Sequence, residues 1–202
     1  MHNVHDNILE CVGSTPLVRL NSVTKGLKAT VYAKVEMLNP GASVKDRIAM
    51  QIIEDAEASG ELKPGGVIVE ATSGNTGAGL AMAAAIKGYQ CIFVLPDKQS
   101  EEKRSALRAY GAKVVVTPTN VAPEDPTSYY SVSRRIADET PNAFYANQYH
   151  NPSNPKAHVR FTGPELYDQI DGKIDAFIAG IGTGSTITGV GQYLKSKKPD
   201  TQ

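Results

Sequence analysis

The sequence is poor in the residues that usually build disulfides and metal sites. Its 202 residues include two cysteines and four histidines. Cys11 and Cys91 lie far apart in no CxxC pattern, and Cys91 sits in an apolar run typical of a core thiol. No histidine pair has zinc-ligand spacing supported by cysteines. We therefore expect neither a disulfide nor a metal site.

Net charge and long apolar runs are also lacking. Lys+Arg and Asp+Glu number 21 each, so the formal net charge is zero and gives no reason to expect nucleic acid or an anionic membrane as a partner. No apolar run approaches the roughly 20 residues of a membrane helix. The opening MHNVHDN lacks the positive region and apolar stretch of a secretory signal, so we expect a cytoplasmic protein.

What the sequence does contain is an alternation of strand and helix patterns. Apolar residues are 41% and charged residues 21%, an ordinary globular composition. Such alternation predicts an α/β fold with a parallel sheet. The patterns predict strands at 30–38, 67–71, 89–95, 113–117, 143–146 and 174–179, and helices at 44–59, 78–87, 100–110, 127–140, 163–170 and 186–197.

Two glycine-rich loops, residues 72–77 and 180–186, each follow a predicted strand and open a predicted helix. Such a position offers free backbone N–H groups and the positive end of a helix dipole, which favour a phosphate or carboxylate. Neither loop matches GxGxxG or a P-loop. Tight turns with capping hydroxyls would explain the same pattern without a ligand.

Lys45 stands at the predicted start of a helix, where the dipole favours anions. That placement and burial both lower the pKa of an amine, which suits a lysine that forms a Schiff base. A solvated surface lysine balanced by Asp46 is the alternative.

Four motifs resemble one enzyme family, the fold type II pyridoxal-phosphate enzymes of the cysteine synthase and cystathionine β-synthase group. NPGASVKDR (39–47) is similar to the family's cofactor-lysine motif and EATSGNTG (70–77) to its asparagine loop. GTGST (182–186) is similar to its phosphate loop, usually GTGGT, and GSTPL (13–17) to its opening segment. The motifs occur in the family's order. The resemblance implies two open, mostly parallel α/β sheets with pyridoxal 5′-phosphate between them.

The resemblance also implies a role for each matching residue. Lys45 would form the internal aldimine and then act as general base, and Asn75 would hydrogen-bond the cofactor's 3′-oxygen. The cofactor phosphate would be held by Gly182, Thr183, Gly184, Ser185 and Thr186. The substrate carboxylate would be held by Thr72, Ser73 and Thr76, with Gln148.

The activity implied is β-replacement, in which L-serine or an activated serine loses its β-substituent to give an aminoacrylate and a thiol then adds. Segments 117–120, 125–130 and 147–155 look more like the cystathionine β-synthase branch, which uses homocysteine. Cysteine synthesis from O-acetylserine and sulfide is the alternative. An inactive, truncated module that binds the cofactor or an anion is a second alternative.

Two departures from the family pattern matter. Ser185 replaces a glycine, which would be unfavourable if φ there must be positive. Family catalytic regions also run on beyond position 202, so we expect an incomplete C-terminus with an exposed apolar face. By resemblance, 1–45 and 148–202 belong to a large cofactor-binding domain, 46–147 forms a small mobile α/β domain, and the protein is a homodimer.

Overall fold

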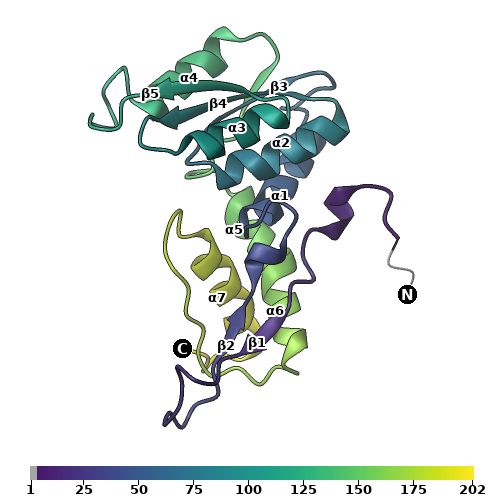
Figure 1. Cartoon of the computed structure of the whole chain (residues 1–202). Coiled ribbons are helices and arrows are strands. Elements are labelled where there is room, and N and C mark those ends of the chain that lie inside the picture. Colours follow the sequence, from purple (N-terminus) through teal and green to yellow (C-terminus); the bar gives the residue numbers. More distant parts are fainter. Residues whose placement is uncertain (1–3) are drawn as a thin grey trace.

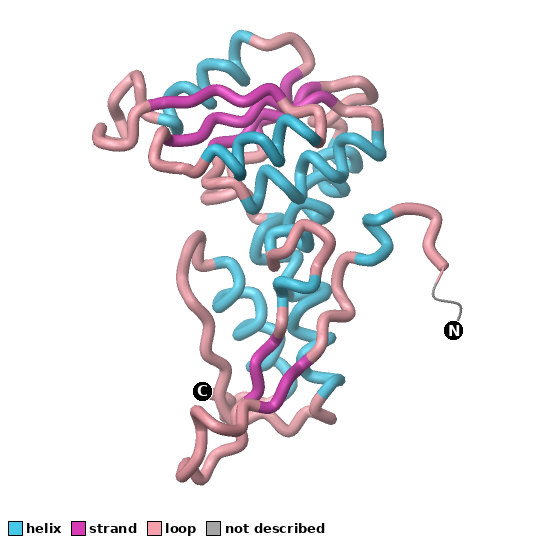
Figure 2. Tube along the Cα trace, viewed as in Figure 1, coloured by secondary structure: helices cyan, strands magenta, loops and turns pink. Residues whose placement is uncertain are grey.

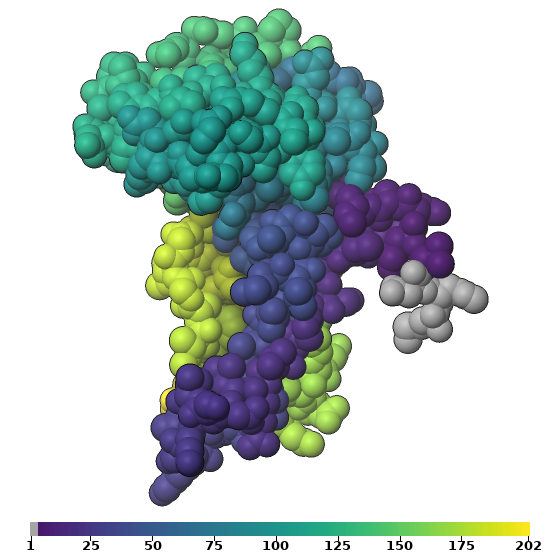
Figure 3. Space-filling model, in the orientation of Figure 1, coloured from purple at the N-terminus to yellow at the C-terminus, as the bar shows by residue number. Residues whose placement is uncertain are grey.

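In the computed structural model, which describes residues 4–202, the chain forms two lobes joined through two helices (Figure 1). One lobe contains a parallel sheet and is called the sheet lobe. The other is narrower (Figure 3), has helices connected by long loops but, among the described residues, no parallel sheet (Figure 2), and is called the helical lobe. The joining helices are α1 (Lys45–Ser59) and α5 (Ser153–Ala157). His2 lies outside the described residues.

The sheet lobe is built on four parallel strands in the order β5-β4-β3-β6. Figure 2 shows α4 on one face of this sheet and α2 and α3 on the other. Coverage on both faces explains why the two central strands read as almost continuous apolar runs. The bounds are β3 (Val67–Ala71), α2 (Asn75–Lys87), β4 (Gln90–Pro96), α3 (Glu101–Ala109), β5 (Lys113–Thr117), α4 (Tyr129–Glu139) and β6 (Ala143–Tyr145).

The core of the sheet lobe lies between the sheet and helices α1 and α2. Ile68, Leu80 and Phe93 are fully buried there, with Ile52 and Ile53 from α1. The small residues of α2 allow it to approach α1 closely. A methyl group at Gly79 would lie 2.9 Å from Cβ of Ala49 and 3.1 Å from the carbonyl oxygen of Lys45. The alanine- and glycine-rich sequence of α2 is therefore explained by close packing.

The helical lobe contains an antiparallel pair of short strands and two longer helices. Its small buried cluster consists of Leu166, Ile174, Val190 and Leu194. The elements are 3₁₀ turns Ile8–Cys11 and Glu36–Leu38, β1 (Leu17–Arg19), β2 (Tyr32–Lys34), the π-helical turn η3 (His158–Thr162), α6 (Gly163–Gln169) and α7 (Ser185–Lys197). Among residues 4–202, no helix combines the length and apolar character needed to cross a membrane.

The strand predicted at 174–179 is wrong. Only one ladder step forms, in which Phe177 N donates to Gln202 O and Gln202 N donates to Asp175 O, both at 2.8 Å. A strand needs neighbours along its length to satisfy its backbone groups, and here a single residue supplies them. Within residues 4–202 the second, mostly parallel sheet is therefore not formed. Ile178 is 92% exposed, as expected for an uncovered apolar segment.

Candidate cofactor and substrate site

The sheet lobe has a topological switch point between β3 and β6. From β3 the chain proceeds outward to β4 and β5, and then returns across the sheet to place β6 on the other side of β3. In open parallel sheets, ligands bind beyond the carboxyl ends of the strands at such a point. The asparagine loop (70–77) leaves the end of β3, and Gln148 follows the end of β6. The fold therefore brings these two predicted parts of the site together.

The asparagine loop is ordered by the side chain of Thr72. Its buried Oγ1 accepts hydrogen bonds from Gly74 N at 3.0 Å and Gly77 N at 3.2 Å, which caps the first turn of α2. This cap starts the helix at Asn75, three residues before the prediction. Gly74 has φ of 128°, which favours glycine. Ser73 and Asn75 are exposed, so their side chains are available to a ligand.

Lys45 is the first residue of α1 and is partly buried. Burial lowers the pKa of its ammonium group, because the charged form loses solvation. Close packing of α2 on α1 places this helix start beside the start of α2, since Gly79 approaches the Lys45 carbonyl oxygen. The placement and the direction of the pKa shift agree with the prediction made from the sequence.

The phosphate loop (182–186) turns into α7 through Gly184, which has φ of 82°. Ser185 is the first residue of α7, is buried, and has no positive φ. The left-handed conformation thus falls on a glycine, and the serine is accommodated without strain. The N-cap residue supplies no side-chain hydrogen bond to the first turn of α7. The N–H groups of that turn suit an anionic ligand.

A chain of hydrogen bonds connects the two loops. Thr76 Oγ1 donates to Gln148 Oε1 at 2.6 Å, and Asn154 Nδ2 donates to Gln148 O at 2.7 Å. The same Nδ2 donates to Thr183 Oγ1 at 3.2 Å, and Thr183 Oγ1 lies 2.9 Å from Ser185 Oγ. The structure therefore brings the predicted carboxylate-binding residues and the phosphate loop into one connected network.

His158 also contacts the phosphate loop. It is fully buried, with Nε2 3.2 Å from Thr186 Oγ1 and Nδ1 2.9 Å from Thr162 Oγ1. Burial lowers the pKa of His158 to about 4, and the positive charges of Lys45 and Arg47 contribute to this shift.

A buried ion-pair network behind Lys45 was not identified from the sequence. Arg47, with 3% exposure, donates to Glu36 Oε2 from Nε at 2.8 Å and to Glu165 Oε2 from Nη1 at 2.7 Å. Lys34 also pairs with Glu165, whose carboxylate accepts hydrogen bonds from Ser14 N and Thr15 N, each at 3.0 Å. The network fixes the 13–17 segment to α1 and α6. Its members are distant in sequence, so only the fold reveals it.

Two acidic residues near the site have raised pKa values. Burial raises the pKa of Asp46 to about 6, although Gly41 N donates to its Oδ2 at 2.5 Å. Burial raises the pKa of Glu70 to about 8, and Gln148 N lies 3.4 Å from both of its carboxyl oxygens. Each holds a loop of the site through backbone N–H groups. Within residues 4–202, no group of three or more His, Cys, Asp or Glu could hold a metal ion.

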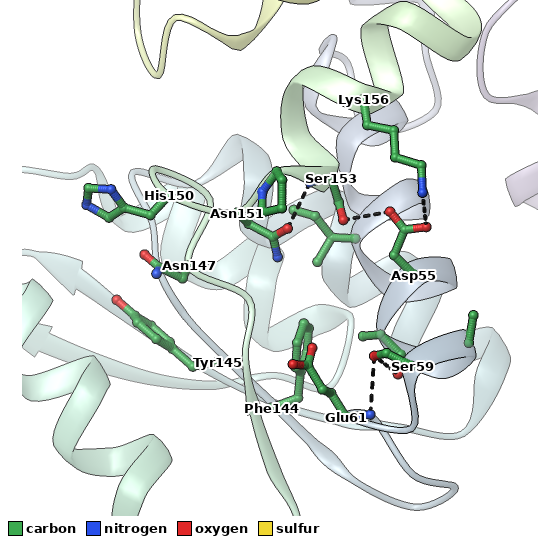
Figure 4. A pocket seen from close by; sticks show the side chains of 14 residues that line it. Asp55, Ser59, Glu61, Phe144, Tyr145, Asn147, His150, Asn151, Ser153 and Lys156 are labelled. Atoms are coloured by element: carbon green, nitrogen blue, oxygen red, sulfur yellow. Dashed lines mark hydrogen bonds and ion pairs between the residues drawn. The ribbon is translucent and has the colours of Figure 1, made fainter.

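A cleft of about 720 Å³ lies elsewhere, between the second half of α1 and the segment 144–156 (Figure 4). Asp55, Tyr145, His150 and Lys156 line it, and Lys156 Nζ pairs with Asp55 Oδ1 at 2.6 Å. None of the predicted site residues lines this cleft. Because the chemistry-bearing groups gather at the helix starts instead, we assign the candidate site there.

A family profile described as "Pyridoxal-phosphate dependent enzyme" matches residues 8–202. The chain is 52% identical to a cystathionine beta-synthase of Apis mellifera over 196 residues, covering 96% of this chain and 39% of that protein. It is 48% identical to a cysteine synthase of Staphylococcus aureus over 198 residues, covering 98% of this chain and 63% of that protein. The chain thus spans less than two thirds of these relatives.

Solved structures agree with the sequence comparisons. A lysine-to-alanine mutant of O-ureido-L-serine synthase with O-ureido-L-serine bound matches with a TM-score of 0.90 and 41% identity, covering 98% of this chain and 61% of that one. A hydrogen sulfide-producing enzyme from Fusobacterium nucleatum matches with a TM-score of 0.92 and 37% identity, covering all of this chain and 65% of that one. These are fold type II enzymes, so the predicted fold class is confirmed, with one of its two parallel sheets formed within residues 4–202.

Proposed function

Because the chain belongs to the pyridoxal-phosphate dependent enzyme family, we propose that it carries the lysine, asparagine-loop and phosphate-loop parts of a β-replacing amino-acid enzyme. The observation that supports this most directly is the position of Lys45. Lys45 begins α1, its carbonyl oxygen lies against Gly79 near the start of α2, and burial lowers the pKa of its amine.

The residues present fit pyridoxal 5′-phosphate. The phosphate would lie at the start of α7, where residues 182–186 offer backbone N–H groups and hydroxyls to an anion. The aldehyde would meet Lys45, whose lowered pKa increases the fraction of nucleophilic free amine. Asn75, exposed at the first residue of α2, would hydrogen-bond the cofactor's 3′-oxygen.

The remaining residues bind substrate and move a proton. When bound, the cofactor supplies an electron sink that stabilises negative charge at the substrate's α-carbon. Lys45 then removes the α-proton as general base. The substrate carboxylate is held at the start of α2 by Thr72, Ser73 and the backbone N–H of Thr76, because the Thr76 hydroxyl hydrogen is already donated to Gln148. Thr72 Oγ1 already accepts two backbone hydrogen bonds, so its hydroxyl hydrogen remains available to a carboxylate oxygen.

Gln148 keeps the carboxylate site in position from the side of β6. Its Oε1 accepts from Thr76 Oγ1 and its Nε2 donates to Ala71 O at 3.2 Å. Both side-chain ends are therefore engaged with the asparagine loop before any substrate binds. We expect residues 46–147 to move relative to 1–45 and 148–202 on binding, which would exclude water from the site.

We favour serine, or an activated serine, and homocysteine as substrates, giving L-cystathionine. Support comes from the 52% identity to a protein named cystathionine beta-synthase and from the motifs near Gln148. Synthesis of L-cysteine from O-acetylserine and sulfide is the alternative, supported by 48% identity to a cysteine synthase. A cofactor- or anion-binding module without turnover is a further alternative, because the start of α7 suits an anion whether or not a reaction follows. A homodimeric assembly and a cytoplasmic location remain predictions.

The test of the proposal is chemical labelling of Lys45. Borohydride reduction in the presence of pyridoxal 5′-phosphate, followed by peptide mapping, should place the label on Lys45. Lys45→Ala should abolish the visible absorption of the bound cofactor, whereas Lys87→Ala, at a surface ion pair, should retain it. A label on another lysine, or none, would contradict the proposal.

Turnover assays separate the alternatives. Serine with homocysteine and O-acetylserine with sulfide should be compared side by side on the same preparation. Faster formation of cystathionine supports the favoured reaction, and faster formation of cysteine supports the alternative. Labelling of Lys45 without either product would support the module without turnover.

A further inference from the structure

Two buried polar side chains lie directly behind the phosphate loop. Asn154 and His158 are 1% and 0% exposed, and they are four residues apart across the continuous helical segment formed by α5 and η3. Side chains with this spacing lie close together on one side of a helix. None of the recognised motifs gives either residue a role, and each contacts a different hydroxyl of the phosphate loop.

Packing between α5 and α7 keeps these contacts short. A methyl group at Gly189 in α7 would overlap the Pro155 carbonyl oxygen and lie 2.6 Å from Cβ of His158. The two helices therefore approach as closely as backbone atoms allow. Such close packing leaves Asn154 and His158 little freedom to move away from Thr183 and Thr186.

To bind a phosphate group, the hydroxyls of Thr183 and Thr186 must act as hydrogen-bond donors. A phosphate oxygen only accepts hydrogen bonds, and a threonine hydroxyl has one hydrogen to donate. The hydroxyl can give that hydrogen to the phosphate when its oxygen accepts from the protein on the other side. Asn154 Nδ2, as an amide donor at 3.2 Å, provides this arrangement for Thr183 when Ser185 Oγ, 2.9 Å from Thr183 Oγ1, donates to that oxygen rather than accepting from it.

His158 provides the same arrangement in one of its tautomers. A neutral imidazole has one donor and one acceptor nitrogen. With hydrogen on Nε2, the ring donates to Thr186 Oγ1, and Nδ1 accepts from the Thr162 hydroxyl. With hydrogen on Nδ1, Thr186 must donate to the ring and has no hydrogen left for a phosphate.

We propose that Asn154 and His158 are positioning residues that fix the hydroxyls of Thr183 and Thr186 as donors toward the 5′-phosphate of the cofactor. This rests on the proposed function, because it assumes that the phosphate loop holds that group. Asn154 also holds the Gln148 carbonyl oxygen at 2.7 Å, so one side chain sets both the phosphate loop and the residue that supports the asparagine loop.

The decisive measurement compares the binding of pyridoxal 5′-phosphate with that of pyridoxal, which has the aldehyde but no phosphate. Dissociation constants are obtained by titrating cofactor-free protein and following the visible absorption. Asn154→Ala should weaken binding of the phosphorylated form about five- to thirty-fold through loss of the hydrogen bond to Thr183. The similarly shaped Asn154→Asp should weaken it at least as much, because a carboxylate cannot donate to Thr183 and repels the phosphate. Both should weaken pyridoxal binding clearly less, because pyridoxal loses only the support that Asn154 gives to the asparagine loop through the Gln148 carbonyl oxygen.

Histidine variants test the direction of the hydrogen bond. His158→Gln places an amide donor near the position of Nε2 and should retain most of the preference for the phosphorylated form. In His158→Asn the side chain is too short to reach Thr186, so this variant should lose the preference for the phosphorylated form. Equal behaviour of the two variants would overturn the assignment for His158.

Asn151 provides a matched control in the same segment. Its side chain bonds only local backbone, donating to Ala146 O and accepting from Ser153 N, both at 2.9 Å. Asn151→Ala should destabilise the segment, seen in the thermal midpoint, without changing the ratio of the two affinities. In a Thr183→Ala background, Asn154→Ala should have no further effect on that ratio.

The outcomes separate this inference from the function itself. If the unmodified protein forms no complex with pyridoxal 5′-phosphate at Lys45, the proposed function fails. If it does, but Asn154→Ala weakens both ligands equally or neither, the positioning role is wrong and the function stands.

Discussion

The sheet lobe and the helical lobe differ in how completely their apolar residues are covered. In the sheet lobe Ile68, Leu80 and Phe93 are fully buried between strands and helices on both faces. The buried apolar cluster described in the helical lobe has four residues, and the neighbouring Ile178 and Ile181 are 92% and 79% exposed. The described helical lobe therefore contributes less burial and leaves apolar side chains exposed to solvent.

Position relative to other strands, more than composition, determines whether an apolar segment of this chain is buried. Segment 174–179 is as apolar as β3, but β3 has a strand on each side and this segment pairs with one residue. The largest expected effect follows from this contrast. Leu80→Ala in the sheet lobe should lower the free energy of unfolding by about 4 kcal/mol, and Leu194→Ala in the helical lobe by about 3 kcal/mol.

The two substitutions are matched, because both leucines lie in helices and are at most 1% exposed. The difference reflects the surroundings, since a partly open core can relax around a cavity better than a closed one. Urea unfolding of both variants measures it. An equal or greater loss for Leu194→Ala would show that the helical lobe is packed as tightly as the sheet lobe.

Glu165→Gln should have the next largest effect, about 3 kcal/mol, because it removes the charge that Arg47 and Lys34 share. Burial alone would raise the pKa of Glu165, but hydrogen bonds from Arg47 and Lys34 lower it to about 2. A lowered pKa stabilises the folded protein above the unfolded value of 4.5 and loses that contribution as the pH falls toward 2. Between pH 6 and pH 2.5 the free energy of unfolding should therefore fall more steeply for the unmodified protein than for the variant.

Glu70→Gln should have the opposite sign and a size of about 2 kcal/mol. Burial raises the pKa of Glu70 from 4.5 to about 8, so the folded protein favours the neutral carboxyl group and loses stability as the pH rises through this range. A glutamine stays neutral, and its oxygen can still accept from Gln148 N. Thermal unfolding at about pH 8 should show a higher midpoint for the variant, with no gain at about pH 4. A lower midpoint at both values would contradict the assignment.

The smallest effect is expected at the surface of the sheet lobe. Lys87 Nζ pairs with Glu57 Oε2 at 2.8 Å, but both side chains are about 30% exposed. Lys87→Met should change the free energy of unfolding by no more than about 0.5 kcal/mol, because solvent screens such pairs. The difference in free energy of unfolding between Lys87→Met and Glu165→Gln, under the same conditions, measures how much burial strengthens an ion pair.

Local signals predicted the sheet lobe well. The predicted bounds of β3 and β5 are confirmed, because short apolar runs between loops define these strands without reference to the rest of the chain. The start of the last helix was predicted within one residue. The helical start at Ser153 was missed because Pro152 and Pro155 suggested a loop, although proline is tolerated in the first turn of a helix.

The sequence predicted the parts of the site that lie in local motifs. It did not predict the parts that depend on contacts between distant residues. Lys45 and the two loops stand in recognisable local patterns. The contacts of Asn154 with Thr183 and of His158 with Thr186 join residues that are distant in the sequence. Nothing in the spacing indicates them, because they depend on how α5 and α7 pack. The roles assigned to the individual site residues remain predictions until labelling and binding are measured.

Because Gly189 has no side chain, α7 can lie directly against the backbone of Pro155 and the side chain of His158. Adding one carbon atom there would push α7 away from Pro155 and His158, and the loop at its start would shift with it. A substitution at Gly189, which is in no predicted ligand contact, should therefore disturb the phosphate loop as much as a substitution within that loop. In this region backbone proximity sets the position of the loop proposed to bind the phosphate.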